Sequence, residues 1–162
     1  MWHPPKRTLD LSAHDLMIRD VVTLPTELSL RAAAHQLVQA DVSGAPVVDA
    51  TGRCVGVLTN RDIVHALEMQ PATAEPQAAD VVAEWQVFDR ADLPVDEVAR
   101  YMSTDVIAAV PDTPVLELAR LMAESHVHRV VILDDAGGVV GLVSATDILA
   151  ALAHEAAVPE WD

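Results

Sequence analysis

The sequence predicts an α/β (α+β) fold in which two tandem β-α-β-β-α repeats pack together with pseudo-two-fold symmetry. The first observation is an internal repeat, because Met17–Leu67 aligns without a gap with Met102–Leu152. The second is that each copy alternates short β-branched runs with amphipathic stretches. The third is composition: 51% of the 162 residues are hydrophobic but only 3% are aromatic, which predicts cores of Val, Leu, Ile and Ala. Two copies are too few for an open solenoid, so a face-to-face pair is expected.

Both copies contain the same elements in the same order. A strand ends at a proline, a helix follows, and two strands joined by a short glycine turn predict an antiparallel hairpin before a second helix. In the second copy Pro114 fits the first helical position. One face of that helix carries Val115, Leu118, Ala119 and Met122. The expected segments are Asp20–Leu24, Ser29–Ala40, Ala45–Val48, Cys54–Leu58 and a helix from Thr59, then Asp105–Val110, the helix at Pro114, Val130–Leu133, Val139–Val143 and a helix from Ser144.

Short lead-in segments and a linker divide the chain. We expect one repeat over residues 9–69, a linker over 70–93 and a second repeat over 94–154. Ser12–Asp15 has the spacing of a capping box, and Pro94–Met102 is its counterpart before the second copy. A short helix is expected over Ala78–Phe88, with Trp85 either docking a partner or covering a sheet edge.

Charge and cysteine content exclude several classes of protein. The net charge of −15 disfavours non-specific binding to nucleic acid or to an anionic membrane. The single cysteine, Cys54, allows no internal disulfide, and its place on an expected strand indicates a core residue. Residues 1–15 have no apolar run after Lys6 and Arg7, so we expect them not to be a signal peptide, and no apolar run in the sequence is long enough to span a membrane. These features predict a cytoplasmic protein.

The second helix of each repeat begins with a hydroxyl residue followed three positions later by aspartate. These starts are Thr59-Asn-Arg-Asp62 and Ser144-Ala-Thr-Asp147. The same pattern has two interpretations, which the sequence does not separate. It forms a capping box that satisfies the first N–H groups of the helix. It also offers N–H groups to phosphate and a carboxylate to the two hydroxyls of a ribose.

Two adjacent basic residues, His128 and Arg129, precede the buried strand of the second copy. They are either an exposed pair with Arg129 bound to a carboxylate, or a cradle for phosphate, which arginine binds in a bidentate manner. The first copy has Ser43-Gly44 at the aligned positions. We therefore expect the two clefts to differ. We also expect the phosphate of a ligand to bind His128 and Arg129 of the second copy.

No pattern of residues indicates catalysis or a metal centre. His126 and His128 would share one face of a strand, but no third ligand is evident. The sequence lacks GxSxG, HExxH and P-loop motifs. We expect a protein that is not an enzyme, with no metal and no required cofactor.

The two copies together resemble the cystathionine-β-synthase (CBS) domain pair, also called a Bateman module. The resemblance rests on Val42–Asp49 and Gly56–Ile63 in the first copy and on Val127–Asp134 and Gly141–Ile148 in the second. It covers about residues 9–154. The second copy is similar to the nucleotide-binding repeats of the AMP-activated kinase γ subunit, which carry a similar His-Arg pair and a similar Ser-x-x-Asp.

This resemblance implies ligand clefts that draw on both repeats. The aspartates of the helix starts are the implied ribose contacts, and the adenine lies against strand residues of either repeat. The implied ligand-binding residues are Val22, Val42, Ser43, Gly44, Thr59, Arg61, Asp62, Ile107, Val127, His128, Arg129, Ser144, Thr146 and Asp147.

The function that follows is a regulatory module for an adenosine-containing ligand: AMP, ADP, ATP, NAD or S-adenosylmethionine. Binding changes the packing of the two repeats, and an unknown protein partner responds to that change. The alternative is a ligand-independent scaffold for dimerisation or interaction. Either way we expect a homodimer, formed by small-residue faces on Ala32–Val38 and Ile148–Ala153.

Overall fold

The computed structural model of the chain describes residues 7–69 and 93–156. The helix expected over Ala78–Phe88 lies outside these residues, as does nearly all of the expected linker. Within the described ranges, no helix is both long and apolar enough to cross a membrane.

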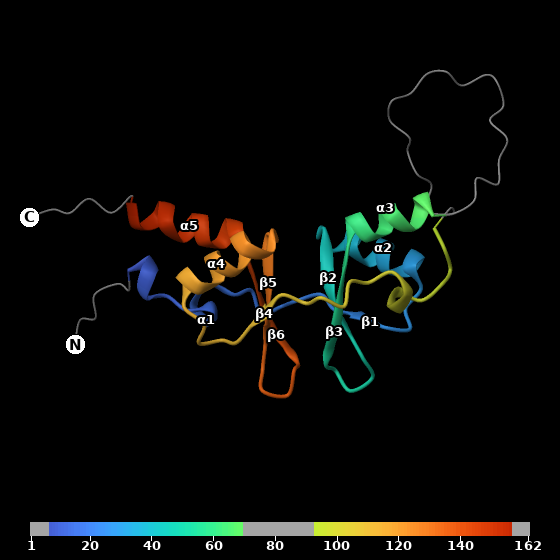
Figure 1. The fold of residues 1–162 in the computed structure, drawn as a ribbon, viewed down its shortest axis with the longest axis horizontal. Helices are drawn as coiled ribbons and strands as arrows, with labels where there is room; N and C mark the ends of the chain where they lie inside the picture. The colour runs from blue at the N-terminus through green and yellow to red at the C-terminus, as the bar shows by residue number, and fades with distance from the viewer. Residues whose placement is uncertain (1–6, 70–92, 157–162) are drawn as a thin grey trace, which may run out of the picture.

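Two β-α-β-β-α units lie side by side, each with its hairpin pointing the same way (Figure 1), as the sequence predicts. In each three-stranded sheet the first strand runs parallel to the second, and the third runs antiparallel to it. The first unit consists of β1 (Leu24–Pro25), α2 (Leu30–Gln39), β2 (Gly44–Val48), β3 (Cys54–Thr59) and α3 (Asn60–Glu68). The second consists of β4 (Ala108–Ala109), α4 (Val115–Ser125), β5 (Arg129–Leu133), β6 (Val139–Ser144) and α5 (Ala145–Ala156).

The first strand of each unit is shorter than expected. Of the expected runs, only Leu24 in the first unit and Ala108 and Ala109 in the second pair with the unit's own sheet, and β1 adds Pro25. The chain just before β1 bonds instead to the opposite unit, where Ile18 and Leu142 exchange two backbone hydrogen bonds of 3.0 Å. Ser103 and Val57 do the same before β4, at 2.9 Å. Alternation of residue types cannot reveal this change of partner. Pro114 is also the N-cap of α4 rather than its first residue.

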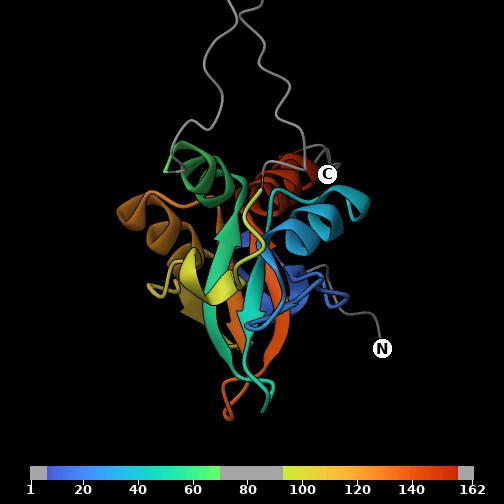
Figure 2. The ribbon, with the colours of Figure 1, turned by 90° about the vertical axis from the view of Figure 1, so that its right-hand side faces the viewer.

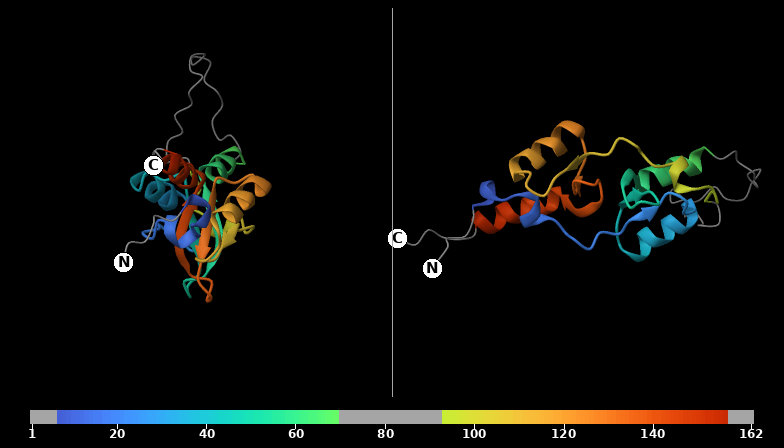
Figure 3. Two further views of the ribbon diagram at one scale, coloured as in Figure 1. Left: turned by 90° about the vertical axis from the view of Figure 1, so that its left-hand side faces the viewer. Right: turned by 90° about the horizontal axis from the view of Figure 1, so that it is seen from below.

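The lead-in of each repeat completes the core of the other repeat. α1 (Ala13–Leu16) has the expected capping box at Ser12, and Ala13 donates to the carbonyl of Thr113 at 2.8 Å. The 3₁₀ helix Val98–Arg100 lies on the first unit, where Val98 donates to the carbonyl of Leu28 at 2.8 Å. Figures 2 and 3 show this exchange, since the blue N-terminal segment lies with the second repeat and the yellow segment with the first.

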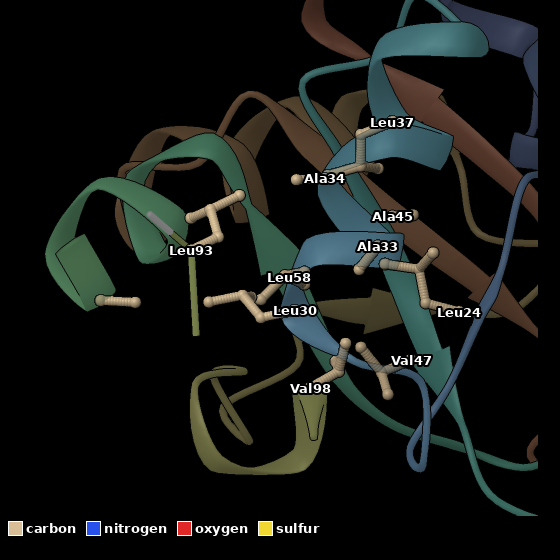
Figure 4. Packing of buried hydrophobic residues seen from close by; sticks show 11 residues of the cluster. Leu24, Leu30, Ala33, Ala34, Leu37, Ala45, Val47, Leu58, Leu93 and Val98 are labelled. Atoms are coloured by element: carbon tan, nitrogen blue, oxygen red, sulfur yellow. The ribbon is translucent and has the colours of Figure 1, made fainter. Parts of the chain in front are cut away.

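Aliphatic side chains form one core cluster in each unit, as the composition predicts. The first cluster is built around Leu30 and Leu37 of α2 and Leu58 of β3, and Leu93 and Val98 enter it from the lead-in of the second repeat (Figure 4). The second cluster takes Ala13 and Met17 from the first lead-in. Cys54 is only half-buried rather than a full core residue, and desolvation raises the pKa of its thiol.

A methionine of each lead-in fills the space left by a glycine of the opposite sheet. Met17 occupies the place of a side chain at Gly141, where an added Cβ would lie 2.4 Å from its Sδ. Met102 does the same at Gly56, at 2.5 Å. These symmetric contacts fix each lead-in on the sheet that it completes.

The two hairpin turns have the same geometry. Asp49 Oδ1 accepts hydrogen bonds from the backbone and hydroxyl of Thr51 at 2.9 and 2.6 Å, and the hydroxyl bond lowers the pKa of this carboxyl. Gly52 and Gly137 have φ values of +83° and +82°, the left-handed conformation that glycine adopts without strain. The hairpin tips meet where Cys54 N donates to the Gly137 carbonyl at 2.9 Å.

Candidate functional site

A cavity of about 820 Å³ lies between the two repeats. Its size falls in the range of sites that bind small molecules and cofactors. The first repeat contributes Ser43, Gly44, Ala45, Pro46, Val57, Thr59, Arg61 and Asp62. The second contributes Ser103, Asp105, Ile107, His126, Val127, His128, Arg129, Val131, Leu142, Ser144, Ala145, Thr146 and Leu149.

The fold brings polar groups to this cavity from both halves. β2 and β5 lie at the centre of the molecule, and the first residues of α3 and α5 lie at the same edge of the two sheets (Figure 1). Backbone hydrogen bonds fix each helix start to the strand beside it: Asn60 N donates to the Ser43 carbonyl, and Ala145 N to the His128 carbonyl, both at 2.9 Å. Polar groups at the start of α3 and of α5 therefore line one cavity.

The capping interpretation of the two helix starts is confirmed. Asp62 Oδ2 accepts bonds of 2.7 Å from both the backbone N–H and the hydroxyl of Thr59. Asp147 Oδ2 accepts the same two bonds from Ser144, also at 2.7 Å. All of these bonds use Oδ2. Capping therefore leaves the second oxygen of each carboxylate free to accept from a ligand.

The two aspartates differ in their relation to the cavity, although their caps are identical. Asp62 lines the cavity, whereas Asp147 is half-buried beside Ser144 and does not. The same asymmetry holds for apolar positions: Ile107 and Val127 line the cavity, whereas Val22 and Val42 pack against the first core cluster. The cavity is thus displaced towards Asp62 and the β4 side.

Basic side chains gather at the mouth of the cavity. Arg129, at the start of β5, and His128 are exposed and line it, together with Arg61 and His126. Arg129 Nη1 donates a hydrogen bond to the hydroxyl of Ser43 in the opposite repeat, so its hydrogen-bond partner is a hydroxyl and not a carboxylate. His126 is not on a strand as expected, because it ends α4 in a left-handed conformation with φ of +54°.

Most of the implied ligand residues meet in this one cavity. Those that line it are Ser43, Gly44, Thr59, Arg61, Asp62, Ile107, Val127, His128, Arg129, Ser144 and Thr146. Val22, Val42 and Asp147 do not line it.

Three polar residues of the cavity, Ser103, Asp105 and His126, are missing from the sequence-based set. Ser103 and Asp105 lie in the segment before β4, and of these two only Ser103 pairs with the opposite sheet, through Val57. Asp105 has an identical counterpart, Asp20, in the repeat alignment, and this identity is a signal that could have found it. Nothing in the sequence marks Ser103.

The residues of the cavity suit an organic ligand with polar and apolar parts. Asp62 and Asp105 offer carboxylates, Arg61 and Arg129 offer guanidinium groups, and the floor is apolar. Among the described residues, no group of three or more His, Cys, Asp and Glu side chains is arranged to hold a metal ion.

The chain is similar to several known proteins. A curated relative, the uncharacterized protein MJ1232 of Methanocaldococcus jannaschii, is 30% identical over 140 residues. The match covers 86% of this chain but 39% of the relative, so the chain spans less than half of that protein.

Solved structures share the fold. The CBS domain pair of protein MJ0100, in complex with methylthioadenosine and S-adenosyl-L-methionine, is 24% identical, with a TM-score of 0.69. CBSX2 in complex with AMP is 20% identical, with a TM-score of 0.70. Each match covers 89% of this chain and 97% of the other.

The family model for the CBS domain matches residues 13–69 and again residues 95–154. Each match spans one of the two three-stranded sheets of the structure. The chain therefore belongs to the CBS domain family and carries one CBS domain in each of its two repeats.

Proposed function

We propose that this CBS pair is a regulatory module that binds one adenosine-containing ligand in the cavity between its repeats. The observation that carries the proposal is the arrangement of the cavity, where the carboxylate of Asp62 lies on one wall and the imidazole of His128 and the guanidinium of Arg129 lie at the mouth. The ligands of the similar solved structures support the class, because AMP, methylthioadenosine and S-adenosylmethionine all contain adenosine.

The ligand is placed by matching its parts to the walls. The ribose hydroxyls donate to Asp62, whose Oδ1 is not used by the cap. The adenine lies against the half-buried side chains of Ile107 and Val127. The phosphate meets Arg129 and His128, because charge-assisted bonds to guanidinium are among the strongest available to phosphate.

The charges around the cavity disfavour a ligand with three phosphates. Two permanent cations, Arg61 and Arg129, face two carboxylates, Asp62 and Asp105, in a chain whose net charge is −15. A triphosphate would add several negative charges that these groups do not balance. Among the candidates AMP, ADP, ATP, NAD and S-adenosylmethionine, AMP therefore fits better than ATP.

Ligand binding regulates because both repeats form the site. A ligand that contacts both walls favours the packing of the repeats in which those contacts are made. We propose that a cytoplasmic protein partner senses this packing, and that the module acts as a homodimer and carries out no catalysis. Exposed Val38 of α2 and Leu152 of α5, 64% and 44% accessible, are candidates for the dimer contact.

Thermal unfolding with a panel of nucleotides tests this function. A ligand at a thousandfold excess over its Kd adds about 4 kcal/mol to the free energy of unfolding. For a chain of this size that is a rise in Tm of about 8–16 °C. Guanosine monophosphate is the matched control, since it changes only the base, and its shift should be smaller than that of AMP. A flat panel would favour the ligand-independent scaffold instead.

A further inference from the structure

Two sets of hydrogen bonds join the two hairpins within the described part of the chain, and they lie at opposite ends. At the tips, Cys54 N donates to the Gly137 carbonyl at 2.9 Å, and Arg53 forms a β-bridge with Gly138. At the mouth of the cavity, the guanidinium of Arg129 donates to the hydroxyl of Ser43. The tips are thus joined through backbone atoms, whereas the mouth is joined by a bond between two exposed side chains.

Both members of the mouth contact line the cavity, so a ligand there meets them directly. Arg129 is paired with Ser144 in the β5–β6 register, and only its side chain crosses to the other repeat. A hydrogen bond from guanidinium to a neutral hydroxyl is weaker than the charge-assisted bond that the same group forms with phosphate. An anion in the cavity therefore competes with Ser43 for Arg129.

We propose that Ser43 and Arg129 form a clasp that the anionic group of a ligand opens. The inference rests on the proposed function and adds its regulation: the charge of the ligand, and not adenosine alone, sets the packing of the repeats at the mouth. When phosphate takes Arg129, Ser43 loses its link to the second repeat. A neutral nucleoside fills the same cavity and leaves the clasp closed.

The clasp is connected to the outer helices through the backbone. The carbonyl of Ser43 accepts from the first N–H of α3, at Asn60, and the carbonyl of His128 accepts from the first N–H of α5, at Ala145. A shift of Ser43 therefore moves the start of α3, and a shift of His128, the chain neighbour of Arg129, moves the start of α5. α3 and α5 lie along one edge of the molecule (Figure 1), where a partner can contact both.

The test compares AMP with adenosine by calorimetry in wild type, Ser43→Ala and Ser43→Thr. Ser43→Ala removes the bond that AMP must break, so we expect AMP to bind about two- to tenfold more tightly, the factor of one net hydrogen bond. Because Ser43 also lines the cavity, the readout is the ratio of AMP affinity to adenosine affinity, which should rise by the same factor. Ser43→Thr keeps the hydroxyl at this exposed position and should preserve the AMP-to-adenosine ratio of wild type.

Hydrogen exchange supplies a second readout. The amide of Asn60 should exchange faster in the AMP complex than in the adenosine complex at equal saturation, and ligand-free Ser43→Ala should already show the faster rate. The clasp is overturned if Ser43→Ala binds AMP, relative to adenosine, no more tightly than wild type does. It is also overturned if the Asn60 amide exchanges at the same rate in the AMP and adenosine complexes. If wild type binds neither ligand, the proposed function fails, and the clasp fails with it. This outcome differs from the others because wild-type binding itself is lost.

Discussion

Replacing Asp62 and Asp147 separately by asparagine distinguishes a ribose contact from a helix cap. Each carboxylate accepts a backbone N–H and a hydroxyl at 2.7 Å, so the two caps are matched in number and length. Asparagine keeps an acceptor and loses only the interaction with the helix dipole. Each variant should therefore lose a few tenths to about 1 kcal/mol of stability.

The two variants should differ in their affinity for AMP, although they lose similar amounts of stability. Asp62 lines the cavity, so Asp62→Asn removes a charged acceptor and points an NH₂ donor at one ribose hydroxyl. We expect a loss of about 1.5–3 kcal/mol, which is roughly tenfold to a hundredfold in Kd. Asp147 does not line the cavity, so Asp147→Asn should bind AMP within about twofold of wild type.

Calorimetry with AMP and urea unfolding on the same preparations measure both quantities. Asp147→Asn is the control for any general effect of weakening a cap. Equal losses of affinity in the two variants would refute the placement of the ribose on Asp62. Stability losses with full affinity in both would leave the two aspartates as caps alone.

Three further predictions concern the phosphate, the packing of the repeats and their assembly. Arg129→Ala should weaken AMP by about 1.5–3 kcal/mol and leave adenosine unchanged in calorimetry, whereas equal losses would make Arg129 structural. Gly141→Ala places a methyl group 2.4 Å from Met17 Sδ and should cost about 1–3 kcal/mol in urea unfolding. That cost should fall in a Met17→Ala background, and strictly additive costs would argue against the contact. Leu152→Glu should convert a dimer to a monomer in light scattering, and monomeric wild type at tens of micromolar would remove the dimer.

Most of the fold could be predicted from the sequence because the chain contains an internal repeat. Gap-free self-similarity establishes two equal units, and local patterns place the hairpins and helices within a residue or two of their observed bounds. The first strand was overestimated because apolar Val22 packs against the first core cluster but does not pair in the sheet. Periodicity reports that a residue packs against a core, and it does not report whether its backbone pairs with a neighbouring strand.

The sequence could supply the candidate residues of the site, but it could not show which of them line the cavity. Asp62 and Asp147 are equivalent in sequence and in capping geometry, and they differ only in which of them lines the cavity. The pairing of Arg129 with Ser43 joins residues far apart in the chain, and no spacing rule links them. That the two clefts differ stays a prediction, and the cavity takes in Asp62 of the first repeat but not Asp147 of the second.

A structure of the protein determined with AMP tests the central claim most directly. The account predicts one nucleotide per chain between the repeats, with its ribose hydroxyls within hydrogen-bond distance of the Asp62 carboxylate and its phosphate on Arg129. In that complex Arg129 should no longer contact Ser43. A nucleotide bound at Asp147 alone, or on an outer surface away from the cavity, would contradict the account.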